Sequence, residues 1–153
     1  MSANRPRVGY TTGVFDMFHV GHLNILRKSR EFCDRLIVGV TTDETVLREK
    51  QKSPIVPYDE RAEIVRNIRF VDEVVPEEST DKLLAWESLR FDVIFKGSDW
   101  KGTRKWNDLE VAFAARGVEV VYFPYTEHTS STKLRTVLDH YMEDISARRL
   151  GGL

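Results

Sequence analysis

The first quarter of the chain constrains the fold most, because it has the pattern of a buried strand, a glycine-containing turn, a helix and a second buried strand. The strands are expected at Val8–Thr12 and Leu36–Val40. The helix between them begins near His19 or Gly21 and keeps its apolar side chains on one face. A helix that joins two strands in this way is the connection that parallel strands need.

The same alternation continues to the end of the chain. Further strands are expected at Glu73–Val75, Asp92–Phe95 and Val118–Phe123. Further helices are expected at Tyr58–Ile68, at Asp81–Leu89 with Thr80 or Asp81 as its cap, at about Asn107–Ala115, and from near Ser130. Alternating strands and helices predict an α/β domain of the doubly wound, Rossmann-like kind, with a parallel sheet covered by helices on both faces. In such sheets ligands bind beyond the carboxyl ends of the strands.

Length and composition predict a single domain over residues 1–153, with its core at about 8–138 and a flexible C-terminal tail at about 146–153. Hydrophobic residues make up 41% and charged residues 31% of the chain, which is not the composition of a disordered protein. The net charge of -1 argues against nucleic-acid binding, and no apolar run approaches the roughly 20 residues of a membrane span. The single cysteine, Cys33, and the lack of a signal-peptide pattern predict a cytoplasmic location.

The turn after the first strand is the strongest candidate site. In Gly13-Val14-Phe15-Asp16 the glycine allows close approach of the backbone, and the helix start that follows offers unpaired amides to an anion. His19 and His22 are three residues apart with Gly21 between them, so both imidazoles project from one helix face. Taken alone, such a pair also fits a metal site or two surface histidines. Because no other ligands stand at metal-site spacing, we expect phosphate here and no metal.

Residues 13–22 read Gly-Val-Phe-Asp-Met-Phe-His-Val-Gly-His, which resembles the signature of the nucleotidyltransferase superfamily that carries a His-x-Gly-His motif. From about Val8 to Leu138 the chain is also similar to the cytidylyltransferases, most of all to those that act on glycerol 3-phosphate. Class I aminoacyl-tRNA synthetases share a related motif, but their Lys-Met-Ser-Lys-Ser loop does not occur in this chain. The similarity rests on segments in the same order: Thr42-Asp43-Glu44, Lys50-Gln51-Lys52, Tyr58-Asp59-Glu60-Arg61, Ile68-Arg69-Phe70-Val71-Asp72-Glu73-Val74, Gly97-Ser98-Asp99-Trp100, Thr126-Glu127 and Ser130-Ser131-Thr132-Lys133.

The resemblance implies an enzyme that joins CTP and a phosphorylated alcohol, glycerol 3-phosphate being favoured, to give a CDP-alcohol and pyrophosphate. It implies that His19 and His22 stabilise the charge that develops on the α phosphate. It further implies that Mg²⁺ arrives bound to the nucleoside triphosphate and that the protein is a homodimer.

Basic residues in the middle of the chain are candidates for phosphate contacts. Lys50 and Lys52 alternate in an expected loop and fit the phosphate of the acceptor, with Lys50 also assigned to catalysis; solvated lysines are the alternative. Arg61 is expected to reach a phosphate from the face of its helix, whereas Arg69 is expected to pair with Asp72 at the surface.

Three later segments are candidates for nucleotide contacts. Asp99 and Trp100 follow a strand, so a carboxylate on the ribose and an aromatic ring beside the sugar or base are expected; a buried loop anchor is the alternative for Trp100. Ser130-Ser131-Thr132 places hydroxyls and free amides at a helix start, where they fit the β and γ phosphates or an ordinary N-cap. By resemblance, Thr126-Glu127 favours cytidine.

One departure from the cytidylyltransferase pattern falls at residue 125. Where that family has Arg-Thr-Glu, this chain has Tyr125-Thr126-Glu127, and a phenol does not replace a guanidinium on a triphosphate. Compensation by His128, Lys133 or Arg135 is one explanation, and a different nucleotide or acceptor is the other. Two alternatives therefore stay open: an adenylyltransferase that uses ATP with FMN or a sugar phosphate, and a nucleotide-binding regulatory module without catalytic activity.

Overall fold

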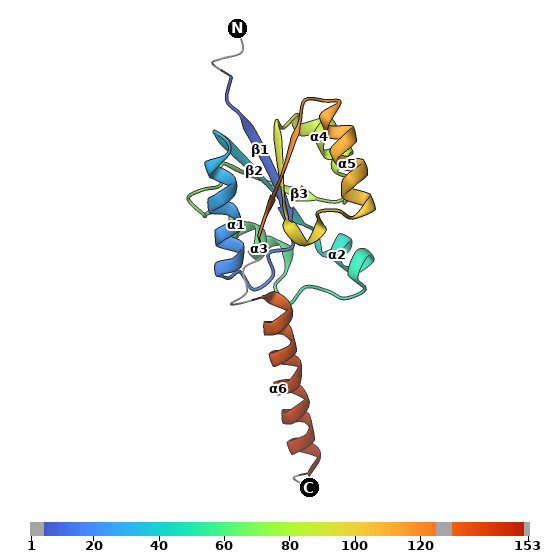
Figure 1. Cartoon of the computed structure of the whole chain (residues 1–153). Coiled ribbons are helices and arrows are strands. Elements are labelled where there is room, and N and C mark those ends of the chain that lie inside the picture. The colour runs from blue at the N-terminus through green and yellow to red at the C-terminus, as the bar shows by residue number, and fades with distance from the viewer. Residues whose placement is uncertain (1–4, 125–129, 152–153) are drawn as a thin grey trace.

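Within the residues that the computed structural model describes, 5–124 and 130–151, five parallel strands form one sheet with helices on both faces (Figure 1). The strands are β1 (Val8–Gly13), β2 (Arg35–Thr41), β3 (Glu73–Glu77), β4 (Val93–Gly97) and β5 (Glu119–Phe123). The helices are α1 (Val20–Glu31), α2 (Asp43–Lys50), α3 (Tyr58–Arg66), α4 (Lys82–Leu89), the 3₁₀ turn η2 (Ser98–Trp100), α5 (Arg104–Ala114) and α6 (Ser131–Gly151). The expected doubly wound α/β fold is confirmed.

The strand order β3-β2-β1-β4-β5 reverses the direction of winding between β1 and β4. β1 pairs with β2 from Val8 to Gly13, but with β4 only at Gly9 and Tyr10. One residue further on, the Thr11 hydroxyl donates to the carbonyl of Phe95 at 3.4 Å. Ligand sites of parallel α/β sheets form at the carboxyl side of such a switch point. The topology therefore directs attention to the ends of β1 and β4.

Each face of the sheet carries its own hydrophobic core. On one face, Leu26 of α1 and Val65 of α3 are fully buried with the strand residue Val38. On the other face, Trp106 and Phe113 of α5 are buried against the strands. Successive strand residues point to opposite faces, so one sheet serves both cores. These cores hold the loops at the carboxyl edge in fixed positions.

α2 is a helix that the sequence analysis missed. Its apolar side chains are few, but Thr42 caps it by accepting from the Thr45 amide at 3.3 Å. Asp43 and Glu44 then place two negative charges in the first turn, where the helix dipole favours them. Capping and charge therefore compensate for the weak apolar pattern.

α6 differs from expectation at its end, because it continues through Gly151 where a flexible tail was expected from about 146. An i,i+4 ion pair between Arg148 and Asp144, 3.2 Å apart, supports the last turns. Figure 1 shows α6 projecting away from the sheet, and none of its side chains is buried. Across residues 5–124 and 130–151, every helix is too short or too polar to span a lipid bilayer.

Candidate active site

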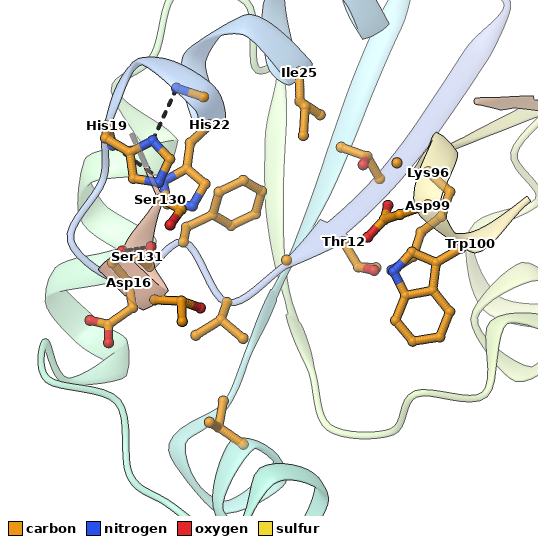
Figure 2. A pocket seen from close by; sticks show the side chains of 18 of the residues that line it. Thr12, Asp16, His19, His22, Ile25, Lys96, Asp99, Trp100, Ser130 and Ser131 are labelled. Atoms are coloured by element: carbon orange, nitrogen blue, oxygen red, sulfur yellow. Dashed lines mark hydrogen bonds between the residues drawn. The ribbon is translucent and has the colours of Figure 1, made fainter. Parts of the chain in front are cut away.

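A cavity of about 470 Å³ lies at the carboxyl ends of β1 and β4, a volume typical of small-molecule sites. Its walls come from the β1–α1 turn, from α2 and the segment after it, from the ends of β4 and β5, from η2 and from the start of α6. Apart from Ile25, the labelled side chains stand on two sides (Figure 2), with Asp16, His19, His22, Ser130 and Ser131 on one and Thr12, Lys96, Asp99 and Trp100 on the other.

The turn between β1 and α1 has a backbone that few sequences adopt. Phe15 and Met17 have positive φ angles of 54° and 51°, a conformation that costs a non-glycine residue about 1–3 kcal/mol. A Cβ on Gly13 would lie 2.9 Å from the Phe15 ring, which is buried and meets His22 edge-on. The packed ring thus holds a strained turn in place, and Gly13 and Val14 line the cavity.

Distant parts of the chain fix the same turn through Asp16. Its carboxylate accepts from the backbone amides of Ile55 at 2.8 Å and Val56 at 2.9 Å. Its carbonyl accepts from the hydroxyl of Ser131, at the start of α6, at 2.5 Å. Asp16 therefore uses its carboxylate within the protein, joining the turn to two other walls of the cavity.

Arg61 lies behind the turn and does not line the cavity. Its buried guanidinium donates to the carbonyls of Val14 at 2.6 Å, Thr41 at 2.8 Å and Val56 at 2.8 Å. It also forms an ion pair with Asp43 at 2.7 Å. The structure therefore does not bring Arg61 to the phosphate site that the sequence predicts, because its donors are used on the backbone of the turn.

The two histidines form a reciprocal cap at the start of α1. His19 Nδ1 accepts from the Gly21 amide at 3.0 Å, and His22 Nδ1 accepts from the His19 amide at 3.2 Å. The rings stack with their centroids 3.9 Å apart, and both line the cavity. A neutral imidazole carries one proton, so an Nδ1 that accepts leaves the proton on Nε2. Both Nε2–H groups are then left to donate to a ligand.

Burial keeps both histidines neutral near pH 7. The pKa of His22 is lowered to about 4, mainly by burial and also by the nearby His19, while Asp16 acts in the opposite direction. Burial also lowers the pKa of His19. The pair is therefore suited to donate neutral hydrogen bonds to phosphate oxygens, with no change in protonation required.

Two lysines and an arginine line the cavity from the end of α2, the segment after it and α6. Lys50 is the last residue of α2, not a loop residue as expected, and Gln51 turns the chain after it with a φ of 59°. Lys52 follows, and Arg135 reaches the same cavity from α6, donating to the carbonyl of Ser53 at 2.8 Å. Both predicted acceptor-binding lysines thus share a cavity with the histidines.

The end of β4 and the turn η2 form the side of the cavity opposite the histidines. A Cβ on Gly97 would lie 2.7 Å from Oδ1 of Asp99, so glycine leaves room for that carboxylate. Trp100 is 43% exposed and lines the cavity, so it is not the buried anchor that was the alternative. A carboxylate beside an exposed aromatic ring is suited to the hydroxyls of a ribose and the face of a base.

The start of α6 combines capping with cavity lining. Ser130 Oγ accepts from the Lys133 amide at 3.0 Å, so the N-cap interpretation is confirmed for this residue. Ser130, Ser131 and Thr132 all line the cavity. The unpaired amides of a helix start favour an anion in this position.

Comparison with known proteins identifies the family. Residues 10–138 match the family model described as cytidylyltransferase-like. The chain belongs to the cytidylyltransferase-like family. This family member is 36% identical over 132 residues to the glycerol-3-phosphate cytidylyltransferase of Bacillus subtilis (strain 168), covering 82% of this chain and 92% of that protein. It is also 36% identical over 146 residues to the FAD synthase of Pyrococcus abyssi (strain GE5 / Orsay), covering 94% and 97%.

Solved structures agree with the fold of this cytidylyltransferase-like chain. The lipopolysaccharide core biosynthesis protein from Thermoplasma volcanium GSS1 matches it with a TM-score of 0.67 at 25% identity, covering 81% of this chain and 99% of that one. Pantoate-beta-alanine ligase from Francisella tularensis matches with a TM-score of 0.62 at 13% identity, covering 82% and 61%, and shows the fold alone.

Most of the predicted site residues of this cytidylyltransferase-like chain meet at one cavity. They are Gly13, Val14, Phe15, Asp16, His19, Gly21, His22, Lys50, Lys52, Asp99, Trp100, Ser130, Ser131 and Thr132. Arg61 stands behind the turn, and Thr126 and Glu127 lie outside the described residues. Sequence reasoning missed Thr12 and Lys96, whose only signal is their place at the ends of the two strands that flank the switch point.

Two further expectations concern charged groups. In the part of the chain that the structure describes, no three His, Cys, Asp or Glu side chains gather as a metal site requires. The expected pair between Arg69 and Asp72 is wrong, because Asp72 pairs with Arg30 at 3.3 Å while Arg69 lies over the Phe70 ring.

Proposed function

We propose that this chain transfers the cytidylyl group of CTP to a phosphorylated alcohol, glycerol 3-phosphate being the favoured acceptor, and releases pyrophosphate. The observation that carries the proposal is the histidine pair, whose two Nδ1 atoms are occupied by backbone amides while the rings line a cavity shared with the α6 start and two lysines. The similarity to glycerol-3-phosphate cytidylyltransferases of Bacillus subtilis and Staphylococcus aureus supports the choice of substrates.

In this mechanism the acceptor phosphate attacks the α phosphorus of the triphosphate in line, and pyrophosphate leaves from the opposite side. No strong base is needed, because a phosphate monoester is already ionised near pH 7. The Nε2–H groups of His19 and His22 donate to the α-phosphoryl oxygens as charge develops there. The chain's own contribution is therefore positioning and neutral hydrogen bonds.

Residues on other walls of the same cavity bind the remaining phosphates. The amides at the start of α6 and the hydroxyls of Ser130 and Thr132 bind the β and γ phosphates, which Mg²⁺ accompanies as part of the nucleotide substrate. Lys50 and Lys52 bind the phosphate of the acceptor and neutralise charge between the two substrates. Arg135 lines the cavity from α6 and takes the part that an arginine at position 125 has in the cytidylyltransferases.

A second candidate is an adenylyltransferase that joins ATP and FMN. The observation that favours it is the FAD synthase of Pyrococcus abyssi, which matches 94% of this chain at the same 36% identity as the Bacillus subtilis enzyme. The two candidates share the histidine chemistry and differ in the nucleoside and the acceptor.

The test is a matrix of CTP and ATP against glycerol 3-phosphate, FMN and sugar phosphates, with pyrophosphate release as the readout. We expect release with CTP and glycerol 3-phosphate above every other pair. Release confined to ATP and FMN would replace the proposal with the adenylyltransferase. Tight nucleotide binding without release for any pair would indicate a regulatory module.

A further inference from the structure

Lys96 is a cavity residue that the mechanism above leaves without a role. It stands one position before the end of β4, on the strand that flanks the switch point. Its ammonium lies 4.9 Å from the ring centroid of Trp100 and 5.7 Å from that of Trp106. Burial, assisted by the charge of Lys82, lowers its pKa to about 8. A partly desolvated cation therefore stands at the edge of a ligand cavity.

The charge of Lys96 is not used by the surrounding protein. Within residues 5–124 and 130–151, its ammonium donates no hydrogen bond and forms no ion pair, and its only contacts of this kind are with the two indole rings. The carboxylate of Glu77 is already held by Lys82 and by the Thr41 hydroxyl, which donates at 2.8 Å. In the described part of the chain, every side-chain nitrogen that is buried from solvent has a hydrogen-bond partner. The Lys96 ammonium has no such partner, so it is accessible to solvent. Because Lys96 lines the cavity, its donors are open to a ligand.

The position of Lys96 separates it from the groups assigned to phosphates. His19, His22 and Ser130 stand on one side of the cavity, and Lys96 stands on the other with Trp100 (Figure 2). Lys50 and Lys52 come from a third wall, at the end of α2. The neighbours of Lys96 are an exposed indole ring, a carboxylate and a threonine hydroxyl, which suit a nucleoside better than a phosphate chain.

We propose that Lys96 determines base specificity, donating from its ammonium to the base of the bound nucleotide and favouring cytosine over adenine. A lysine ammonium donates hydrogen bonds and accepts none. Cytosine presents the adjacent acceptors O2 and N3, whereas the pairing edge of adenine places an amino donor beside its one acceptor. A base that packs against the Trp100 ring on the side where the Lys96 ammonium lies brings such an edge toward the ammonium. This inference rests on the proposed function and assigns recognition of the nucleotide base to Lys96.

Lys96→Met tests the proposal, because methionine has a similar length and suits the space between two indole rings. Binding of CTP and of ATP, each with Mg²⁺ and without acceptor, is measured by isothermal titration calorimetry. We expect Kd for CTP to rise about tenfold or more, the loss of one charged hydrogen bond, while Kd for ATP changes less than about threefold. Arg148→Met removes an exposed positive charge near the end of α6 and controls for the change in net charge.

Lys96→Arg is the second variant, because it keeps a cationic donor between the rings, and it should retain most of the preference for CTP. The proposal would be overturned if Lys96→Met raised Kd for CTP and Kd for ATP by the same factor, or left Kd for CTP unchanged. It would also be overturned if the unmodified protein bound ATP more tightly than CTP. Since no acceptor is present, a lack of turnover would count against the proposed function alone and leave this measurement intact.

Discussion

Replacing Arg61 by methionine tests whether this residue anchors the β1–α1 turn or binds substrate. Arg61 is 1% exposed, and its guanidinium donates hydrogen bonds to three backbone carbonyls and to Asp43. Each bond contributes about 1 kcal/mol net, so four bonds amount to about 4 kcal/mol. Removing one partner from a buried charged network costs a similar 3–5 kcal/mol or so. We therefore expect Arg61→Met to lower the free energy of unfolding by about 4 kcal/mol.

Urea unfolding followed by circular dichroism measures this loss. Arg66→Met is the matched control, because Arg66 stands on the same helix and forms an exposed ion pair with Glu63 at 2.7 Å. Such a surface pair contributes about 0–1 kcal/mol, so the control should unfold almost as the unmodified protein does. An Arg61→Met variant that stays within about 1 kcal/mol of the original stability but no longer binds triphosphate would refute the anchoring role.

Three further outcomes follow from the site. His22→Ala removes the Nε2 donor, so kcat for pyrophosphate release should fall about 100-fold to 1,000-fold, while His140→Ala on the exposed face of α6 leaves kcat unchanged; equal losses would contradict the assignment. The pKa of His22 is about 4 when folded, below the ordinary value of about 6.5, so the unfolded chain binds more protons between these values. Stability should therefore decrease as the pH falls from about 6.5 to about 4, less steeply in His22→Ala, as urea unfolding at each pH will show. In steady-state kinetics, Lys50→Met should raise KM for the acceptor about tenfold and change KM for the nucleotide by less than about threefold. An equal rise in both KM values would exclude a specific role of Lys50 in acceptor binding.

The order of elements was predictable because hydrophobic periodicity is local. Strands such as Leu36–Val40 and helices such as Asp81–Leu89 carry their own apolar patterns, and Asp81 caps α4 as its sequence suggests. α2 was missed because its two apolar residues, Val46 and Leu47, form no periodic face. The signal that would have found it is Thr42 followed by two acidic residues, a start pattern without a hydrophobic stripe.

The chemistry of the site was predictable only where sequence neighbours hold it together. The two histidines are three residues apart at the start of α1, and this spacing is sufficient to predict that they lie close together. The expected placement of both on one helix face is wrong, because His19 is the extended N-cap and only His22 lies within α1. The burial of Arg61 is not local, because its partner carbonyls at Val14 and Thr41 lie 47 and 20 residues away. Lys96 follows the apolar residues of β4, and the pairing of β1 with β4 places it at the cavity.

Transfer of the α phosphorus to a phosphorylated acceptor is tested most directly by following a radioactive label from CTP. With ³²P at the α position and glycerol 3-phosphate as acceptor, the proposed reaction places all transferred label in CDP-glycerol and leaves the pyrophosphate unlabelled. His22→Ala should form the same product at the reduced rate given above. Label recovered in neither CDP-glycerol nor the product of another phosphorylated acceptor, while CTP still binds, would contradict nucleotidyl transfer at this site.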